Sequence, residues 1–119
     1  MKDIYQMAAE FRTAMLKAKA NREFSGDGLI EFFPRGNCDL LGRYLLEQAG
    51  VRSWYTSGEV SSESHVWLTL EDDDIVDITG DQYKDRSGSL YYDLPVYVGK
   101  MDAFHSQFRL NGDPVEITP

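Results

Sequence analysis

The first regular pattern in the chain is a stretch of apolar residues at helical spacing, from about residue 3 to residue 21. Its apolar positions recur every three or four residues, at Ile4, Met7, Ala8, Phe11, Ala14, Met15 and Ala18. This spacing puts them on one face of an α-helix, and Asp3 is suited to cap its first turn. The pattern predicts an amphipathic packing helix, which the polar, glycine-containing segment 21–28 ends.

A second helix is predicted to follow the turn-forming residues 34–36. Asn37 is a suitable N-cap, and Asp39 falls in the first turn, where negative charge is favoured. Gly50 suits the position just after the last turn. The apolar stripe of this helix consists of Leu40, Leu41, Tyr44, Leu45 and Ala49.

From Val51 onward the pattern changes to that of strands. In segment 65–71 the apolar residues Val66, Leu68 and Leu70 alternate with His65, Trp67 and Thr69, as in a strand with two different faces. Further strands are predicted at 51–57, 75–79 and 94–99, the last of these at an edge because it contains Pro95, and loops at 58–64, 72–74 and 80–89. A short helix capped by Asp102 is expected within 101–108, followed by a turn and an extended end over 111–119.

Two helices followed by a run of strands indicate the α+β class, with N-terminal helices packed on an antiparallel sheet. A chain of 119 residues without an internal repeat or a linker is expected to form a single domain, residues 1–119.

Composition excludes some kinds of partner. The net charge of −8 and the pI of about 4.6 argue against nucleic acid and against anionic membranes, because no basic stripe is present. The first residues lack the apolar run of a signal peptide, and no segment is long enough to span a bilayer. We therefore expect a cytoplasmic protein, with export by a non-classical route as the alternative.

Cys38 is the single cysteine and stands at the predicted start of the second helix. Free backbone N–H groups and the helix dipole stabilise a thiolate at such a position and can hold the oxyanion formed when the thiolate attacks a carbonyl. Gly36 allows a substrate to approach closely. The alternatives are a buried, inert cysteine and a redox-sensing thiol.

His65 is the candidate base, because nucleophilic cysteines need a base that a third group orients. It shares its strand face with Trp67, which can shield a Cys–His pair from water. The other histidine, His105, is a distant second candidate. Asp77, between apolar neighbours, is the candidate orienting group, with Asp81 as its rival.

The length of the loop after the strand at 65–71 decides where Asp77 lies. A three-residue loop puts Asp77 opposite Thr69, and a five-residue loop puts it opposite Trp67, one diagonal step of about 7 Å from His65. A loop with an even number of residues turns Asp77 to the other face. A Cys38–His65–Asp77 triad therefore predicts an odd-length loop or a bulge.

The sequence contains no pattern typical of a metal or nucleotide site. The acidic run at 71–74 lacks the spacing of a calcium loop, and one cysteine with two separated histidines does not suggest structural zinc. No phosphate-binding glycine motif is present. We expect neither a metal nor another cofactor.

The ordered set "RGNCDLLGRYLLEQAG", "HVWLTL" and "IVDIT" resembles the papain-like and transglutaminase-like superfamily of cysteine enzymes. The stretch "DITGDQY" also looks like small bacterial papain-fold proteins, including toxin-type deamidase domains. The resemblance covers about residues 33 to 83. It implies Cys38 as nucleophile, His65 as general base and acid, and Asp77 as the residue that orients His65. Papain has a glutamine six residues before its cysteine, where this chain has Phe32, so the oxyanion donors implied here are the Cys38 amide, Asn37 and Gln82.

The reaction expected from this resemblance is acyl transfer through a thioester, by an amidase, peptidase, deamidase or transglutaminase-type enzyme acting on a protein or peptide-like amide. Gly36, Asn37, Trp67 and Gln82 are the candidate substrate or oxyanion residues. The alternative is a non-catalytic binding module that retains the papain-like fold and acts through a protein partner.

Overall fold

The computed structural model describes residues 3–21 and 38–119. Its two long helices are those that the sequence predicts. The first, α1, spans Ile4–Ala20, and the Asp3 carboxylate accepts a hydrogen bond of 2.6 Å from the amide of Gln6. The predicted cap of this helix is therefore confirmed, and Met7, Ala8 and Phe11 are its buried residues.

The second helix, α2, spans Cys38–Ala49. Leu41 and Leu45 are buried, and Leu40, Tyr44 and Ala49 pack partly buried against the same core. Gly50 follows the helix with a φ of +65°, the conformation expected of a glycine at a helix end. The proposed cap Asn37, and Gly36 before it, lie outside the described residues.

Strands β1, Ser53–Val60, and β2, Glu63–Leu70, form a long antiparallel hairpin. The prediction of a loop over 58–64 is wrong, because both strands continue to a two-residue turn at 61–62. Gly58 pairs with His65, and a Cβ at this glycine would lie 2.9 Å from the Cβ of Phe108. The glycine marks a close approach of the chain rather than a break in the strand.

The rest of the sheet is built from short strands: β3 at Ile75–Asp77, β4 at Tyr97–Gly99, β5 at Arg109–Leu110 and β6 at Val115–Glu116. The strand order is β4-β3-β2-β1-β5, and β6 also pairs with β1. Segment 94–99, predicted as the last strand, is therefore followed by two more. These two strands lie at exposed positions and, with two residues each, are too short to show an alternating pattern in the sequence.

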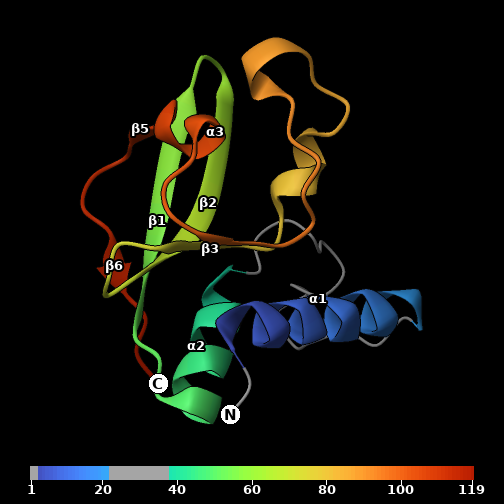
Figure 1. Cartoon of the computed structure of the whole chain (residues 1–119), viewed down its shortest axis with the longest axis vertical. Coiled ribbons are helices and arrows are strands. Elements are labelled where there is room, and N and C mark those ends of the chain that lie inside the picture. The colour runs from blue at the N-terminus through green and yellow to red at the C-terminus, as the bar shows by residue number, and fades with distance from the viewer. Residues whose placement is uncertain (1–2, 22–37) are drawn as a thin grey trace.

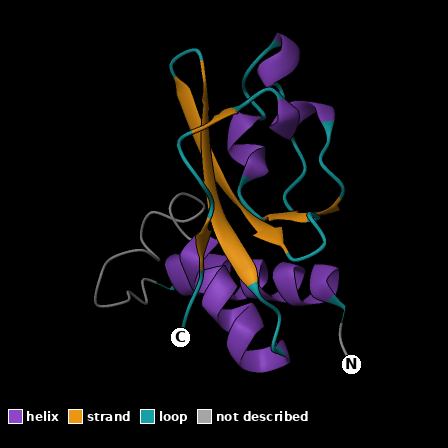
Figure 2. Ribbon diagram, turned by 90° about the vertical axis from the view of Figure 1, so that its left-hand side faces the viewer, coloured by secondary structure: helices purple, strands orange, loops and turns teal. Residues whose placement is uncertain are grey.

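Two 3₁₀ turns, η1 at Gly80–Tyr83 and η2 at Gly88–Leu90, interrupt the predicted loop 80–89. The predicted short helix is α3, Ala103–Ser106, and Asp102 caps it by accepting a 2.8 Å hydrogen bond from the amide of His105. Figures 1 and 2 show α1 and α2 crossing at one end of the β1–β2 hairpin, while α3 and the 3₁₀ turns lie beside its other end.

Both faces of the sheet are covered. We call one the helix side, where α1 and α2 pack on Leu68, Leu70, Val76 and Ile78. We call the other the aromatic side, where the buried residues are Trp67, Ile75, Tyr83, Tyr92, Phe104 and Phe108. The domain is thus α+β with an antiparallel sheet, as predicted. No described helix is long and apolar enough to cross a membrane.

Candidate functional site

His65 and Asp77 meet because of the hairpin register. The β2–β3 ladder pairs Leu68 with Val76 and Thr69 with Ile75, which leaves the five residues 70–74 between the last paired residues. The same register, continued, puts Asp77 opposite Trp67 and one diagonal step from His65. His65 Nε2 lies 2.6 Å from Asp77 Oδ2, and both side chains are fully buried. This is the arrangement that the odd-length loop predicts.

The rival carboxylate, Asp81, is engaged elsewhere. Its Oδ2 forms an ion pair of 2.8 Å with Arg12 Nη2 on α1, and Arg12 Nη1 also donates to the carbonyl of Ile78. The carboxylate that contacts His65 is therefore that of Asp77. Arg12 instead ties η1, which carries Gln82, to the first helix.

The Asp77 carboxylate is held in place by both of its oxygens. Oδ1 accepts hydrogen bonds from the amide of Thr79, at 2.8 Å, and from its hydroxyl, at 3.2 Å. Burial alone would raise the pKa of Asp77, but the hydrogen bonds and charges of His105 and His65 lower it far below its usual value. Asp77 is therefore ionised although it is buried.

The second nitrogen of His65, Nδ1, lies 3.1 Å from Gln82 Nε2. The tautomer with its proton on Nε2 satisfies both contacts, because Nε2–H then donates to Asp77 and Nδ1 accepts from the Gln82 amide. Nδ1 therefore carries the lone pair that a general base needs, here engaged by the Gln82 amide. Among the predicted substrate or oxyanion residues, Gln82 is the one that contacts His65 by a hydrogen bond in the described part of the chain.

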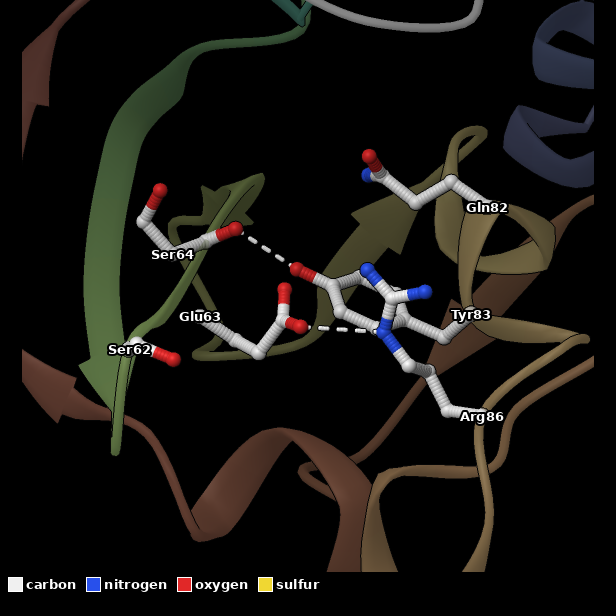
Figure 3. Close-up of a pocket in the computed structure, with 6 residues that line it drawn as sticks. All are labelled: Ser62, Glu63, Ser64, Gln82, Tyr83 and Arg86. Carbon is white, nitrogen blue, oxygen red and sulfur yellow. Dashed lines mark hydrogen bonds and ion pairs between the residues drawn. The ribbon is translucent and has the colours of Figure 1, made fainter.

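His65 and Gln82 also line a cavity of about 340 Å³, together with Tyr55, Ser57, Ser64, Val66 and Thr79. The β2–β3 ladder ends before Val66, so no β3 residue covers β2 at this point. Figure 3 shows a second cavity beside it, which shares Ser64 and Gln82 and contains the ion pair between Glu63 and Arg86, of 2.9 Å. Gln82 thus stands between two adjoining cavities.

Cys38 opens α2, as predicted, but its thiol is not hydrogen-bonded to His65. The thiol donates instead to the carbonyl oxygen of Val66, with an S–O distance of 3.5 Å, and the residue is 1% exposed. Burial, and after it the negative charges of Asp77 and Asp39, raise the pKa of the Cys38 thiol well above its usual value. In this conformation Cys38 is a neutral thiol.

Trp67 is fully buried on the aromatic side and does not line the His65 cavity. Its ring lies 5.8 Å from that of His65 and 5.1 Å from that of His105, measured between centroids. Trp67 therefore excludes water from the side of the His65 imidazole that faces the aromatic core. Because it does not line the cavity, it is not placed to contact a substrate.

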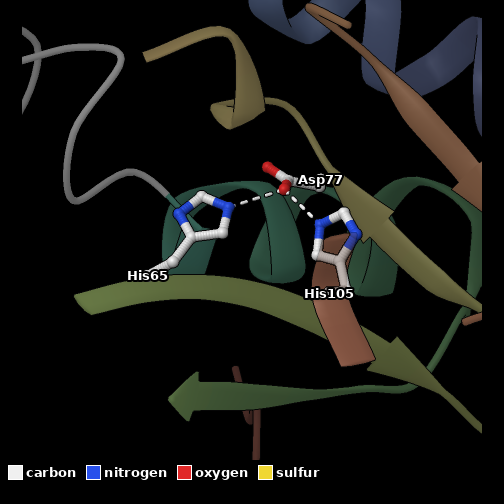
Figure 4. Close-up of side chains that lie close together, drawn as sticks. All are labelled: His65, Asp77 and His105. Carbon is white, nitrogen blue, oxygen red and sulfur yellow. Dashed lines mark hydrogen bonds and ion pairs between the residues drawn. The ribbon is translucent and has the colours of Figure 1, made fainter. Parts of the chain in front are cut away.

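His105 is the residue whose importance the sequence did not reveal. Its Nε2 lies 2.6 Å from Asp77 Oδ2, so one carboxylate oxygen is shared by two imidazoles (Figure 4). Its Nδ1 lies 2.6 Å from Asp102 Oδ1. The one local signal was the spacing of Asp102 and His105, three residues apart across a helix start.

The trio His65, Asp77 and His105 has the residue types of a metal site, and its ligand atoms all lie within 4.8 Å of one another. Two ligands bound at about 2.1 Å to one tetrahedral ion lie about 3.4 Å apart. The Nε2–Oδ2 distances of 2.6 Å are instead those of charge-assisted hydrogen bonds. We call this buried, hydrogen-bonded set of His65, Asp77 and His105 the relay.

Comparison of the chain with models of protein families, with curated proteins and with solved structures gives no significant match.

Proposed function

We propose that this protein is a cysteine-dependent acyl-transfer enzyme with a papain-like or transglutaminase-like core. Cys38 is the nucleophile, His65 the general base and acid, and Asp77 the group that orients His65. The observation that carries the proposal is the state of His65, whose Nε2 is fixed on a buried carboxylate while Nδ1 contacts Gln82, a residue that lines a cavity together with His65. The His65–Asp77 pair supplies two members of a catalytic triad, and the third member is a nucleophile at His65 Nδ1.

Cys38 does not line this cavity, but it contacts a residue that does. Val66, whose carbonyl oxygen accepts the hydrogen bond of the thiol, lines the cavity beside His65. Reaction requires the Cys38 side chain to turn from the Val66 carbonyl toward His65 Nδ1, and Gln82 to leave that nitrogen.

The chemical steps then balance without a cofactor. The thiol proton passes to His65 Nδ1 as the sulfur–carbon bond forms at an amide or ester carbonyl. His65 returns this proton to the leaving amine or alcohol, which leaves a thioester on Cys38. Water or an amine, deprotonated by His65, attacks the thioester and releases the thiol. Water gives hydrolysis or deamidation, and an amine gives transamidation.

The Gln82 amide becomes available as an oxyanion donor once it leaves His65, because it lines the same cavity. The proposed substrate is a protein or peptide-like amide. The net charge of −8 favours a neutral or basic one, and disfavours nucleic acid and anionic membranes. We propose a cytoplasmic setting, because a single cysteine that can form no internal disulfide fits a reducing compartment.

Trapping of the acyl group on Cys38 tests this function. The protein is incubated with p-nitrophenyl acetate at neutral pH, and the site of acetylation is found by peptide mass spectrometry. We expect acetyl-Cys38 in the native protein, none at this position in Cys38→Ala, and a rate about 100-fold lower in His65→Gln. Acetylation of surface lysines alone, or an unchanged rate in His65→Gln, contradicts the enzyme.

A non-catalytic binding module is the second candidate, and the burial of Cys38 favours it. A neutral thiol that is 1% exposed and bonded to a backbone carbonyl is also what an inert core cysteine looks like. Such a module is expected to remain folded and unreactive toward the ester, and Cys38→Ala then behaves like the native protein in every assay.

A further inference from the structure

His105 is clamped between two carboxylates. Its Nε2 lies 2.6 Å from Asp77 Oδ2, and its Nδ1 lies 2.6 Å from Asp102 Oδ1. The imidazole is fully buried, whereas the Asp102 side chain is about one quarter exposed. Figure 4 shows the rings of His65 and His105 on either side of the Asp77 carboxylate.

This geometry fixes the protonation of His105. An ionised carboxylate only accepts hydrogen bonds, so each of these contacts needs an N–H on the ring. A neutral imidazole has one N–H and satisfies one contact, whereas an imidazolium satisfies both. Consistently, although burial opposes the charge, the hydrogen bonds and charges of Asp77 and Asp102 raise the pKa of His105.

The groups around His105 come from each element packed against it. They are Asp77 of β3, Asp102 before α3, His65 of β2, Tyr97 of β4, and Tyr92 between η2 and β4. Tyr92 donates a 3.2 Å hydrogen bond to Asp102 Oδ2. Burial and the nearby Asp102 raise the pKa of both tyrosines, so they remain neutral in the pH range in which a histidine titrates.

We propose that His105 is a positioning residue: held as an imidazolium between Asp102 and Asp77, it keeps the Asp77 carboxylate ionised and aimed at His65 Nε2. This inference rests on the proposed function, because it assigns His105 a part in the reaction of Cys38 and His65. His105 touches neither the cavity nor the thiol, and it acts through Asp77.

The imidazolium also limits how strongly Asp77 acts on the other members of the site. With His105 charged, the Asp77 charge is shared between two partners. In its absence the full charge of Asp77 would act on the Cys38 thiol, which would ionise less readily. His105 thus adjusts the pH range in which the Cys38 thiolate forms.

Nitrogen-15 NMR of the histidine side chains gives a test that does not depend on activity. The chain has two histidines, so four ring nitrogens are to be assigned. At neutral pH we expect both nitrogens of His105 to carry protons and His65 to carry one on Nε2. In Asp102→Asn, the titration midpoint of His105 should fall by about one pH unit. A His105 with a single proton in the native protein overturns the inference.

The same spectra distinguish a metal site. Zinc or manganese is added to the protein, and the histidine resonances are followed. We expect no change at micromolar metal, because the three ligand atoms already satisfy one another. Displacement of the Nε2 protons of both histidines by the metal overturns the relay.

The pH dependence of Cys38 acetylation then tests whether His105 acts on the reaction. In His105→Gln we expect the rising part of the profile to move to higher pH by about one unit, with the plateau rate within a few-fold of native. Ser106→Ala, an exposed position on the same helix, is the matched control and should leave the profile in place. A rate lowered equally at every pH, or an unmoved profile, contradicts the positioning role. Absence of acetylation in the native protein instead removes the proposed function itself, while the NMR result for His105 stands separately.

Discussion

The two sides of the sheet hold their polar groups in opposite ways. On the aromatic side, Asp77 is fixed by Thr79 and by both histidines, with hydrogen bonds of 2.6 to 3.2 Å. On the helix side, the Cys38 thiol has one longer contact, of 3.5 Å, with a backbone carbonyl. In the proposed enzyme the His65–Asp77 pair is therefore preorganised, whereas Cys38 has to move to meet it.

Among the changes considered, removal of the Asp77 charge, which both histidines contact, should lower the free energy of unfolding most. Asp77→Asn leaves the His105 imidazolium without one of its two anions inside the aromatic core, so we expect a loss of about 3 to 5 kcal/mol in the free energy of unfolding. Urea denaturation measures it. Asp113→Asn, which changes an exposed carboxylate, is the control and should cost less than about 0.5 kcal/mol. Equal stability of the two variants would show that the relay is not structurally important.

Two glycine-to-alanine substitutions compare how closely side chains pack on the aromatic side and on the helix side of the sheet. At Gly80 a Cβ would lie 2.5 Å from Cε2 of Tyr92, whose ring stacks on Phe104, so Gly80→Ala should cost about 1 to 3 kcal/mol. At Gly42 a Cβ would lie 2.8 Å from Cγ1 of Ile117 and 3.0 Å from Oγ of Ser53, so these two side chains also have to shift.

The helical position of Gly42 adds a compensating gain, because alanine stabilises a helix by about 1 kcal/mol relative to glycine. Gly42→Ala is therefore expected to be close to neutral. Thermal unfolding of both variants tests the comparison, and a larger loss for Gly42→Ala would mean that the helix side is the more rigid one.

The pH dependence of the free energy of unfolding should reflect two titratable groups of the aromatic side, Asp77 and His105. Because the pKa of Asp77 is lowered in the folded state, its contribution is complete above about pH 4 and is lost as the pH falls further. Because the pKa of His105 is raised, its contribution is complete below about pH 6.5 and is lost as the pH rises through the folded value. The two together predict greatest stability between about pH 4 and 6.5.

Denaturation of the native protein and of His105→Gln from about pH 3 to about pH 9 isolates the histidine part. The difference between them should be largest on the acidic side of neutrality and should shrink as the pH rises. A difference that is independent of pH would mean that His105 is neutral in the folded protein.

The smallest effect on stability is expected at Gln82. It is half-exposed and lines a cavity, so water can replace its amide at His65 Nδ1 in Gln82→Ala. We expect a change below about 1 kcal/mol in urea denaturation but a loss of about 100-fold in the rate of Cys38 acetylation, if the amide holds the oxyanion. An unchanged rate would remove Gln82 from the oxyanion site.

Local signals made the helices predictable. Asp3, Asp102 and Gly50 each act within one helical turn, and the structure confirms all three. The hairpin was predicted less well because Gly58 signals a loop in sequence, whereas in the fold it makes room for Phe108. The pairing of β5 and β6 with β1 depends on backbone contacts that leave no mark on their side chains.

The contacts of the candidate site likewise divide into those set by local sequence pattern and those between residues far apart in the sequence. The pairing of His65 with Asp77 follows from alternation along β2, which is readable from the sequence, and from a five-residue loop, which is one of the lengths that the sequence left open. The choice against Asp81 depends on Arg12, which lies 69 residues away, and the contact of His105 with Asp77 spans 28 residues. The thiol's contact with the Val66 carbonyl depends on how α2 packs on β2, which sequence patterns do not specify.

The most direct test of the central claim is a chemical cross-link between the two halves of the site. 1,3-Dibromoacetone joins a thiol to an imidazole that it can reach across three carbons, and peptide mass spectrometry identifies the joined residues. If Cys38 and His65 act together, native protein gives a Cys38–His65 cross-link, which is lost in His65→Gln and in urea. Native protein in which Cys38 stays unmodified, or is alkylated without joining His65, would contradict the claim.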